Sequence, residues 1–192
     1  GTQLKYYLAS GGAYTDITPI RETATLSGPF AASNGSTTLT VTDTSHGAIA
    51  GDFVTFSGAT ALGGNVTAAV LNAEHEIASI TSSNVYLITL SVTANASDSG
   101  NGGTVTAAYQ LNIGLNTVVL GSGWGAGTWG ADGYGSASTE SVETGTLRLW
   151  SHDSFGEDLL INPRDGGIYY WDATSPSARA TNITAATGKS QP

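Results

Sequence analysis

Short apolar and β-branched runs recur along almost the whole chain, separated by clusters of glycine, asparagine, aspartate and proline. Runs of this length, rich in Val, Ile, Leu, Thr and Tyr and bounded by turn-forming residues, are typical of β-strands. The segments that fit are KYYLA, ATLS, TTLTV, DFVTFS, HEIASI, VYLITLSV, TVTAAYQL, NTVVL, TLRLW, DLLIN and IYYWD. The pattern predicts an all-β protein made of antiparallel hairpins and meanders.

Composition divides this β-protein into three parts. Residues 1–29 are interpreted as the N-terminal strands of a parent β domain, and the Thr-rich residues 30–110 as an inserted module of sandwich or barrel-like form. Residues 111–192 combine a Gly/Trp-rich segment with a meander. Helical periodicity is confined to residues 67–77, where it fits one or two short turns.

Two hairpins are predicted inside the inserted module. In the first, TTLTV and DFVTFS flank a loop with Gly47 and Gly51 near its ends, where His46 and Asp52 can touch backbone amides. In the second, VYLITLSV and TVTAAYQL flank the loop NASDSGNGG. A lone histidine such as His46 is a weak metal signal.

The segment LWSHDSFGEDLLINPRDGGIYYWD, residues 149–172, predicts a three-stranded meander with turns at SHDSFGE and PRDGG. In the second turn Pro163 pre-sets φ, Asp165 can accept local amide bonds, and Gly166 and Gly167 are expected at positive φ. Turn chemistry therefore accounts for these polar residues.

Catalysis by the acidic residues of this meander is disfavoured by their spacing. His152 and Asp153 are expected in the first turn and Asp165 in the second, at opposite ends of the middle strand. The adjacent Glu157 and Asp158 are expected to point to opposite faces. No catalytic residue is predicted here.

Two further groups of polar residues have structural interpretations. Glu74 and Glu76 would share one strand face with His75 on the other, which favours a solvated carboxylate face. Asp98 and Asn101 resemble a calcium loop only loosely, because the alternating acidic ligands are missing. We predict neither a metal site nor a cofactor.

Charge excludes one class of partner. Six basic and 15 acidic residues give a formal net charge of −9, which would repel nucleic acid. The chain has no cysteine, so disulfides and thiolate chemistry are absent, and no apolar run reaches the length of a membrane span. A start at Gly1 without methionine suggests a piece of a longer polypeptide or a processed chain.

The segment GSGWGAGTWGADGYGSAS spaces Trp124, Trp129 and Tyr134 at intervals of five residues among glycines. Exposed rings stack on sugar faces, whereas buried rings fill large areas between strands or subunits. Packing is favoured over glycan binding, but these three residues are the strongest candidates for ligand contact.

The run LRLWSHDSFGEDLLINPRDGGIYYWD, with ITPIRE and GWGAGTWG upstream, resembles large structural proteins of tailed bacteriophages, especially short-tailed ones. SHGAIAGDFVTFSG is similar to a small β-module inserted in phage tail proteins. The resemblance implies a virion tail component, a nozzle or tube subunit that contacts other copies of itself and neighbouring tail proteins. It implies no catalytic residues.

Two other functions stay open at this point. One is a receptor- or carbohydrate-binding module that uses Trp124, Trp129 and Tyr134 with a host glycan. The other is a glycan depolymerase, which would need a pair of carboxyl groups about 5 Å or roughly 6.5 to 9.5 Å apart. In the tail proteins that the sequence resembles, a meander like that of residues 149–172 forms one blade of a β-propeller. Only one such propeller-blade-like unit is recognisable in this sequence, whereas a propeller needs several.

Overall fold

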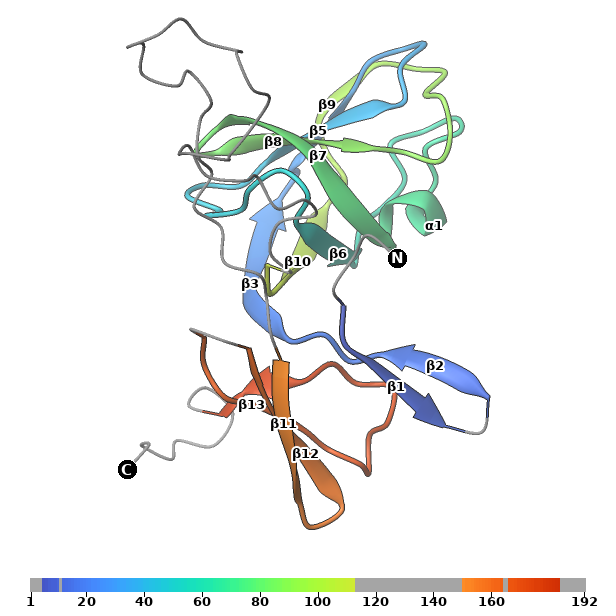
Figure 1. Ribbon diagram of the computed structural model, residues 1–192. Helices are drawn as coiled ribbons and strands as arrows, with labels where there is room; N and C mark the ends of the chain where they lie inside the picture. Colours follow the sequence, from blue (N-terminus) through green and yellow to red (C-terminus); the bar gives the residue numbers. More distant parts are fainter. Residues whose placement is uncertain (1–4, 11, 113–149, 164–165, 184–192) are drawn as a thin grey trace, which may run out of the picture.

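The computed structural model describes residues 5–10, 12–112, 150–163 and 166–183 (Figure 1). Within these ranges the chain forms antiparallel sheets of two, eight and four strands, together with one helical turn, α1 (Ala68–Leu71). The predicted all-β class is confirmed. The expected strand NTVVL lies outside the described residues.

The eight-stranded sheet holds the middle of the chain. Its strands, in spatial order, are β3 (Ile20–Ser27), β10 (Thr104–Gln110), β6 (Phe53–Ser57), β7 (Glu74–Ser82), β8 (Val85–Thr89), β5 (Thr38–Thr42), β4 (Phe30–Ala32) and β9 (Asp98–Asn101). We call residues 20–110 the module. Strand β3 belongs to this sheet, although the sequence division grouped it with residues 1–29.

The sheet is rolled around its own core. Strand β3 leads into β4, β9 leads into β10, and the two bent segments pair along both halves, β3 with β10 and β4 with β9. Glycine is required at the bends: Gly28 has φ +53°, and a Cβ there would lie 2.3 Å from the Gly100 oxygen. At Gly102, φ is +104° and a Cβ would lie 2.4 Å from the Phe30 ring.

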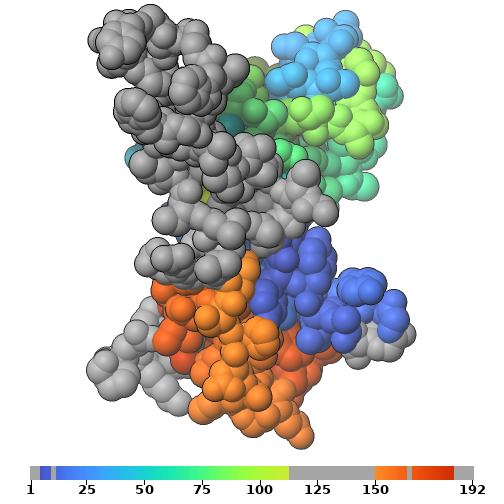
Figure 2. All heavy atoms as spheres, viewed as in Figure 1, coloured from blue at the N-terminus to red at the C-terminus, as the bar shows by residue number. Residues whose placement is uncertain are grey.

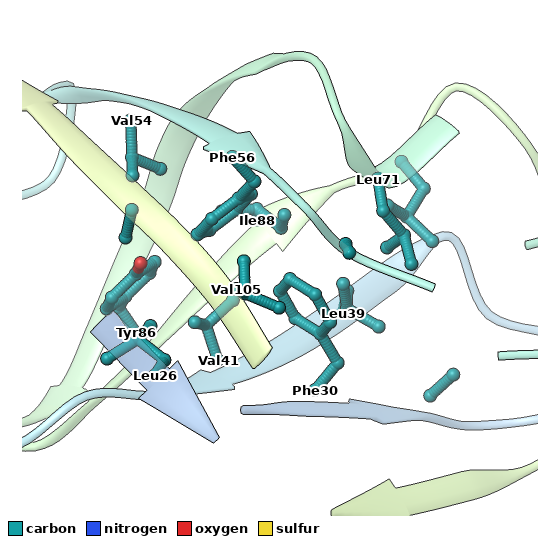
Figure 3. Close-up of a cluster of buried hydrophobic side chains, with 14 of the residues drawn as sticks. Leu26, Phe30, Leu39, Val41, Val54, Phe56, Leu71, Tyr86, Ile88 and Val105 are labelled. Atoms are coloured by element: carbon teal, nitrogen blue, oxygen red, sulfur yellow. The ribbon is translucent and has the colours of Figure 1, made fainter. Parts of the chain in front are cut away.

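The rolled sheet buries an apolar core in which side chains from different strands point toward one another (Figure 3). The rings of Phe30 and Phe56 meet edge to face with centroids 5.1 Å apart. Leu39, Val41 and Ile88 are fully buried beside them. The alternation of buried and exposed positions along β5 follows the period-2 pattern read from the sequence.

Both predicted hairpins of the module are wrong. Strand β5 pairs with β4 and β8, while β6 pairs with β10 and β7. Likewise β8 pairs with β5 and β7, and β10 with β3 and β6. Turn residues between two strands permit a hairpin, but the closing of the rolled sheet over its core decides which strands become neighbours.

The two ends of the described chain build a second unit, which we call the terminal body (residues 5–18 and the described part of 150–183). Its strands are β1 (Tyr7–Ser10) and β2 (Ala13–Asp16), a hairpin, and β11 (Trp150–Phe155), β12 (Asp158–Pro163), β13 (Tyr169–Trp171) and β14 (Thr181–Asn182). The last four form a meander in chain order, as in a propeller blade.

The hairpin packs on the meander through a small apolar core. Figure 2 shows the atoms of β1 and β2 against those of the meander. The buried members of this core are Ile17, Ile161, Tyr169, Trp171 and Ala180. Tyr6 from the N-terminal end packs its ring against Trp150, with centroids 5.5 Å apart. The module is thus an insertion between two segments that belong to one body.

Candidate functional site

The loop between β5 and β6 holds its polar residues in backbone contacts. His46 is buried, its Nδ1 accepts from the Ala48 amide at 3.0 Å, and its Nε2 lies 3.2 Å from the Ser82 oxygen. Asp52 accepts from the Ile49 amide at 2.9 Å. Gly47 and Gly51 have φ of 58° and 87°.

Asp52 also meets residues outside its own loop, because its second carboxylate oxygen accepts from the Asn112 side chain at 2.6 Å. Burial raises the pKa of Asp52, although the Ile49 amide, Asn112 and Arg21 act in the opposite direction. The carboxylate therefore ties this loop to the segment that follows β10.

A buried polar chain that sequence reasoning missed adjoins this loop. The Tyr86 and Tyr109 hydroxyls lie 2.9 Å apart, and Tyr109 donates to Asp43 at 2.5 Å. The His46 ring packs edge-on against Tyr86 with centroids 5.0 Å apart. Arg21 lies over the Tyr109 ring and donates to the His46 oxygen at 3.1 Å.

The hydrogen bonds that link Tyr86, Tyr109 and Asp43 connect three strands or loops of the module. Burial raises the pKa of both Tyr86 and Tyr109 well above the usual phenol value, so both hydroxyls stay protonated at neutral pH. Inward-facing tyrosines need hydrogen-bond partners for their hydroxyls. The period-2 pattern of VYLIT and TVTAAYQ could have flagged Tyr86 and Tyr109 as inward-facing, but not their contact with Asp43.

In the meander, two residues that were predicted in a turn lie on a strand. His152 and Asp153 lie on β11 and are exposed, while the turn itself falls at Gly156 and Glu157. The turn prediction for His152 and Asp153 is therefore wrong, because the Ser and Asp residues of WSHDSF are compatible with an exposed edge strand. Asp158 begins β12 and accepts from the Tyr170 hydroxyl and, at 2.9 Å, from the Ala173 amide.

The turn after β12 also differs from expectation. The Gly166 amide donates to the Pro163 oxygen at 3.0 Å, which closes the turn. Neither Gly166 nor Gly167 adopts the left-handed backbone that the sequence predicts. Gly166 is needed for space instead, since a Cβ there would lie 2.7 Å from Cγ of Pro163. Asp165 lies outside the described residues.

The aromatic series Trp124, Trp129 and Tyr134 also lies outside the described residues. Glycan binding through these rings stays a prediction.

A cluster of charges joins the module to the terminal body. Arg179 contacts Asp16 at 2.9 Å and Glu74 at 2.7 Å, and Lys5 contacts Asp16 at 3.4 Å and also Glu74. Gln110 donates to the same Glu74 carboxylate. We call Lys5, Asp16, Glu74, Arg179 and Gln110 the Glu74 cluster.

Glu74 lies on the exposed face of β7, as the sequence predicts, but its carboxylate is also paired with two cations, which the sequence did not predict. Alternation along β7 is as expected, with Glu74 and Glu76 on one side and a buried His75 on the other. Burial would raise the pKa of Glu74, but Lys5 and Arg179 outweigh it and hold the pKa below its ordinary value. Only the folding of the chain ends against β7 brings these cations to Glu74.

A shallow groove of about 450 Å³ lies beside this cluster, between α1 and the end of β8. Its lining residues are Ala69, Val70, Ala73, Glu74, His75, Glu76, Thr89, Leu90 and Ser91. Burial lowers the pKa of His75, whose Nε2 lies 3.2 Å from the Leu71 oxygen. In the part of the chain that the structure describes, no three His, Asp or Glu side chains are grouped to hold a metal ion.

Comparison with known proteins leaves the family open. No protein-family model and no curated protein matches the chain. Among solved structures, the chain is similar to a phage phi92 endosialidase at 18% identity and a TM-score of 0.40, over 84% of this chain and 23% of that one. It thus spans less than a quarter of that protein's length, and a likeness of this size assigns neither fold nor activity.

None of the helices among the described residues has the length and apolar character to span a membrane.

Proposed function

We propose that this chain is a non-catalytic structural subunit of a phage virion tail, of the nozzle or tube type, which assembles with copies of itself and neighbouring tail proteins. The observation that carries the proposal is the incomplete terminal body. The terminal body has five buried core residues and, among the described residues, one four-stranded meander, whereas a propeller stacks several such blades. Neighbouring chains would supply the missing blades.

The exposed surface of the terminal body supports this proposal. Among the described residues, β11 has a strand on only one side, and its last residue, Phe155, is 62% exposed. Tyr7 and Tyr14 are 50% and 77% exposed on the β1–β2 hairpin. An open strand edge with large apolar side chains invites pairing with another chain. The sequence resemblance to tail proteins is our reason for proposing a tail component as that other chain.

Self-association of the full chain tests the proposal. We expect analytical ultracentrifugation to show oligomers whose population rises with protein concentration. Phe155→Ala should raise the apparent dissociation constant of the oligomer by about tenfold. Truncation of an aromatic residue that dominates an interface costs more than about 1 kcal/mol of association free energy. Ile49→Ala, which removes an exposed apolar side chain of the module, is the matched control.

A chain that stays monomeric at every concentration, and that does not bind purified tail particles lacking it, would rule the proposal out. Equal loss of association in Phe155→Ala and Ile49→Ala would instead move the contact away from the terminal body.

A further inference from the structure

We infer that Glu74 is an electrostatic latch that docks the module on the terminal body and fixes the orientation of one against the other. This inference goes beyond the proposed function, and it does not depend on self-association. It rests on which side of the junction each charge of the Glu74 cluster comes from.

The terminal body contributes three of the four charges. Lys5 precedes β1, Asp16 ends β2, and Arg179 precedes β14. The module contributes Glu74 alone, at the first position of β7, where pairing with Thr55 of β6 holds the backbone in place. Glu74 is therefore the ionic contact of this cluster that crosses the junction.

The four charges alternate in sign. Each cation contacts both carboxylates, so Asp16 and Glu74 share Lys5 and Arg179. Asp16 is held in place by its own bonds from Thr18, at 2.9 Å from the amide and 2.6 Å from the hydroxyl. Asp16 thus positions both cations within the terminal body before they meet the module.

Burial makes these contacts stronger than ordinary surface ion pairs. The side chains of Lys5 and Asp16 are 4% and 17% exposed, and those of Arg179 and Glu74 are 24% and 29% exposed. The Lys5 ammonium lies 3.9 Å from the centre of the Phe53 ring of the module. Partly buried charges are less screened by salt and cost more to leave unpaired.

Removal of the Glu74 charge would leave two cations facing one carboxylate beside Phe53 and the buried Gln110. Docking would then desolvate an unbalanced positive charge, which is unfavourable. Among the described residues, the other links at the junction include two backbone bonds, from the Ile20 amide to the Ala180 oxygen at 3.2 Å and from the Leu111 amide to the Pro19 oxygen at 2.8 Å. The Leu111 side chain also packs against the core of the terminal body, and Lys5 lies over the Phe53 ring. The two units would turn relative to each other about these links.

Residual dipolar couplings of the full chain test the latch, because two units with a fixed mutual orientation share one alignment tensor. We expect one tensor for the unaltered protein and two different tensors for Glu74→Gln. Glu76→Gln is the matched control: it makes the same change two residues along the same strand, at an exposed carboxylate outside the cluster. This control should keep the shared tensor.

A shared tensor in Glu74→Gln, or separate tensors in the unaltered protein, would overturn the inference. Separation of the units by Glu76→Gln to the same extent would also overturn it, because it would make the effect one of net charge. If Glu74→Gln does not fold, Arg179→Gln decides the question, since it removes a cation that contacts both carboxylates. A shared tensor in Arg179→Gln would then count against the latch.

Discussion

The module and the terminal body differ most in how much core each contains. The module buries a cluster of twenty residues within one continuous stretch of chain, while the terminal body buries five that come from both ends of the described chain. A small core leaves little free energy above the cost of ordering the chain. The comparison predicts that the module is stable by itself, and it agrees with our proposal that neighbouring chains complete the terminal body.

The polar interiors of the two units do not differ in the same way, because the module also has a buried side-chain atom without a partner among the described residues, Oε1 of Gln110. The module closes its polar chain internally, from Tyr86 through Tyr109 to Asp43. In the terminal body, the buried indole nitrogen of Trp171 has no hydrogen-bond partner among the described residues. Buried donors are usually paired in a complete fold. The size of the core, and not the pairing of buried polar atoms, therefore separates the two units.

Excision should give the largest contrast. Residues 19–112 on their own are expected to fold and to unfold in one cooperative transition, because all strands of the eight-stranded sheet lie within them. Circular dichroism during chemical denaturation would measure this. A non-cooperative transition, or a spectrum without β-structure, would show that the module needs the terminal body and would break the comparison.

Truncation of a core ring should have the next largest effect. Phe56→Ala removes a ring that is 1% exposed and packs on Phe30, so the free energy of unfolding should fall by about 3–5 kcal/mol. Phe155→Ala makes the same change at a side chain that is 62% exposed and should alter it by less than about 0.5 kcal/mol. Denaturant titration of both variants under conditions that keep the chain monomeric measures the difference. Equal losses would contradict the assignment of Phe56 to the stabilising core.

The buried polar chain should show a smaller and graded effect. Tyr109→Phe removes the donor to Asp43 and leaves a buried carboxylate oxygen unpaired, which should cost about 1–3 kcal/mol. Tyr86→Phe removes only the hydroxyl that bonds to Tyr109 and does not touch the carboxylate. It should lower the free energy of unfolding by about 1 kcal/mol. Thermal unfolding of the two variants gives the order. A larger loss in Tyr86→Phe would mean that Asp43 finds another donor.

Acid should have the smallest effect on overall stability and should act on the junction. The pKa of Glu74 in the folded protein is below its ordinary value of 4.5, so its ionised form contributes docking energy that is complete above pH 4.5. That contribution disappears as the pH falls through the lowered value and the carboxylate takes up a proton. Dipolar couplings should therefore keep one tensor at pH 5 and lose it at lower pH.

Glu74→Gln is the control for the acid experiment, because its two tensors should not change over that pH range. A loss of the shared tensor already above pH 5 would point to a group other than Glu74.

The all-β class, most of the strands and the meander of residues 150–171 could be predicted from the sequence, whereas β4, β9 and β14 were not predicted, and β9 lies in a segment that the sequence predicts as a loop. Period-2 alternation and turn-forming residues are local signals, and β5, β7 and the β11–β12–β13 order carry them clearly. The bends at Gly28 and Gly102 were not predicted, because the need for glycine there comes from the Gly100 oxygen and the Phe30 ring, which the chain brings up from elsewhere.

Strand pairing and the meaning of the charges were decided only by the tertiary structure. The sequence placed β5 beside β6 because they are neighbours along the chain, whereas in the rolled sheet β5 pairs with β8 and β6 pairs with β10. Glu74 looked like a solvated carboxylate, since Lys5 and Arg179 lie 69 and 105 residues away. Alternation along a strand sets which way a side chain faces, but only packing between distant segments sets what it meets.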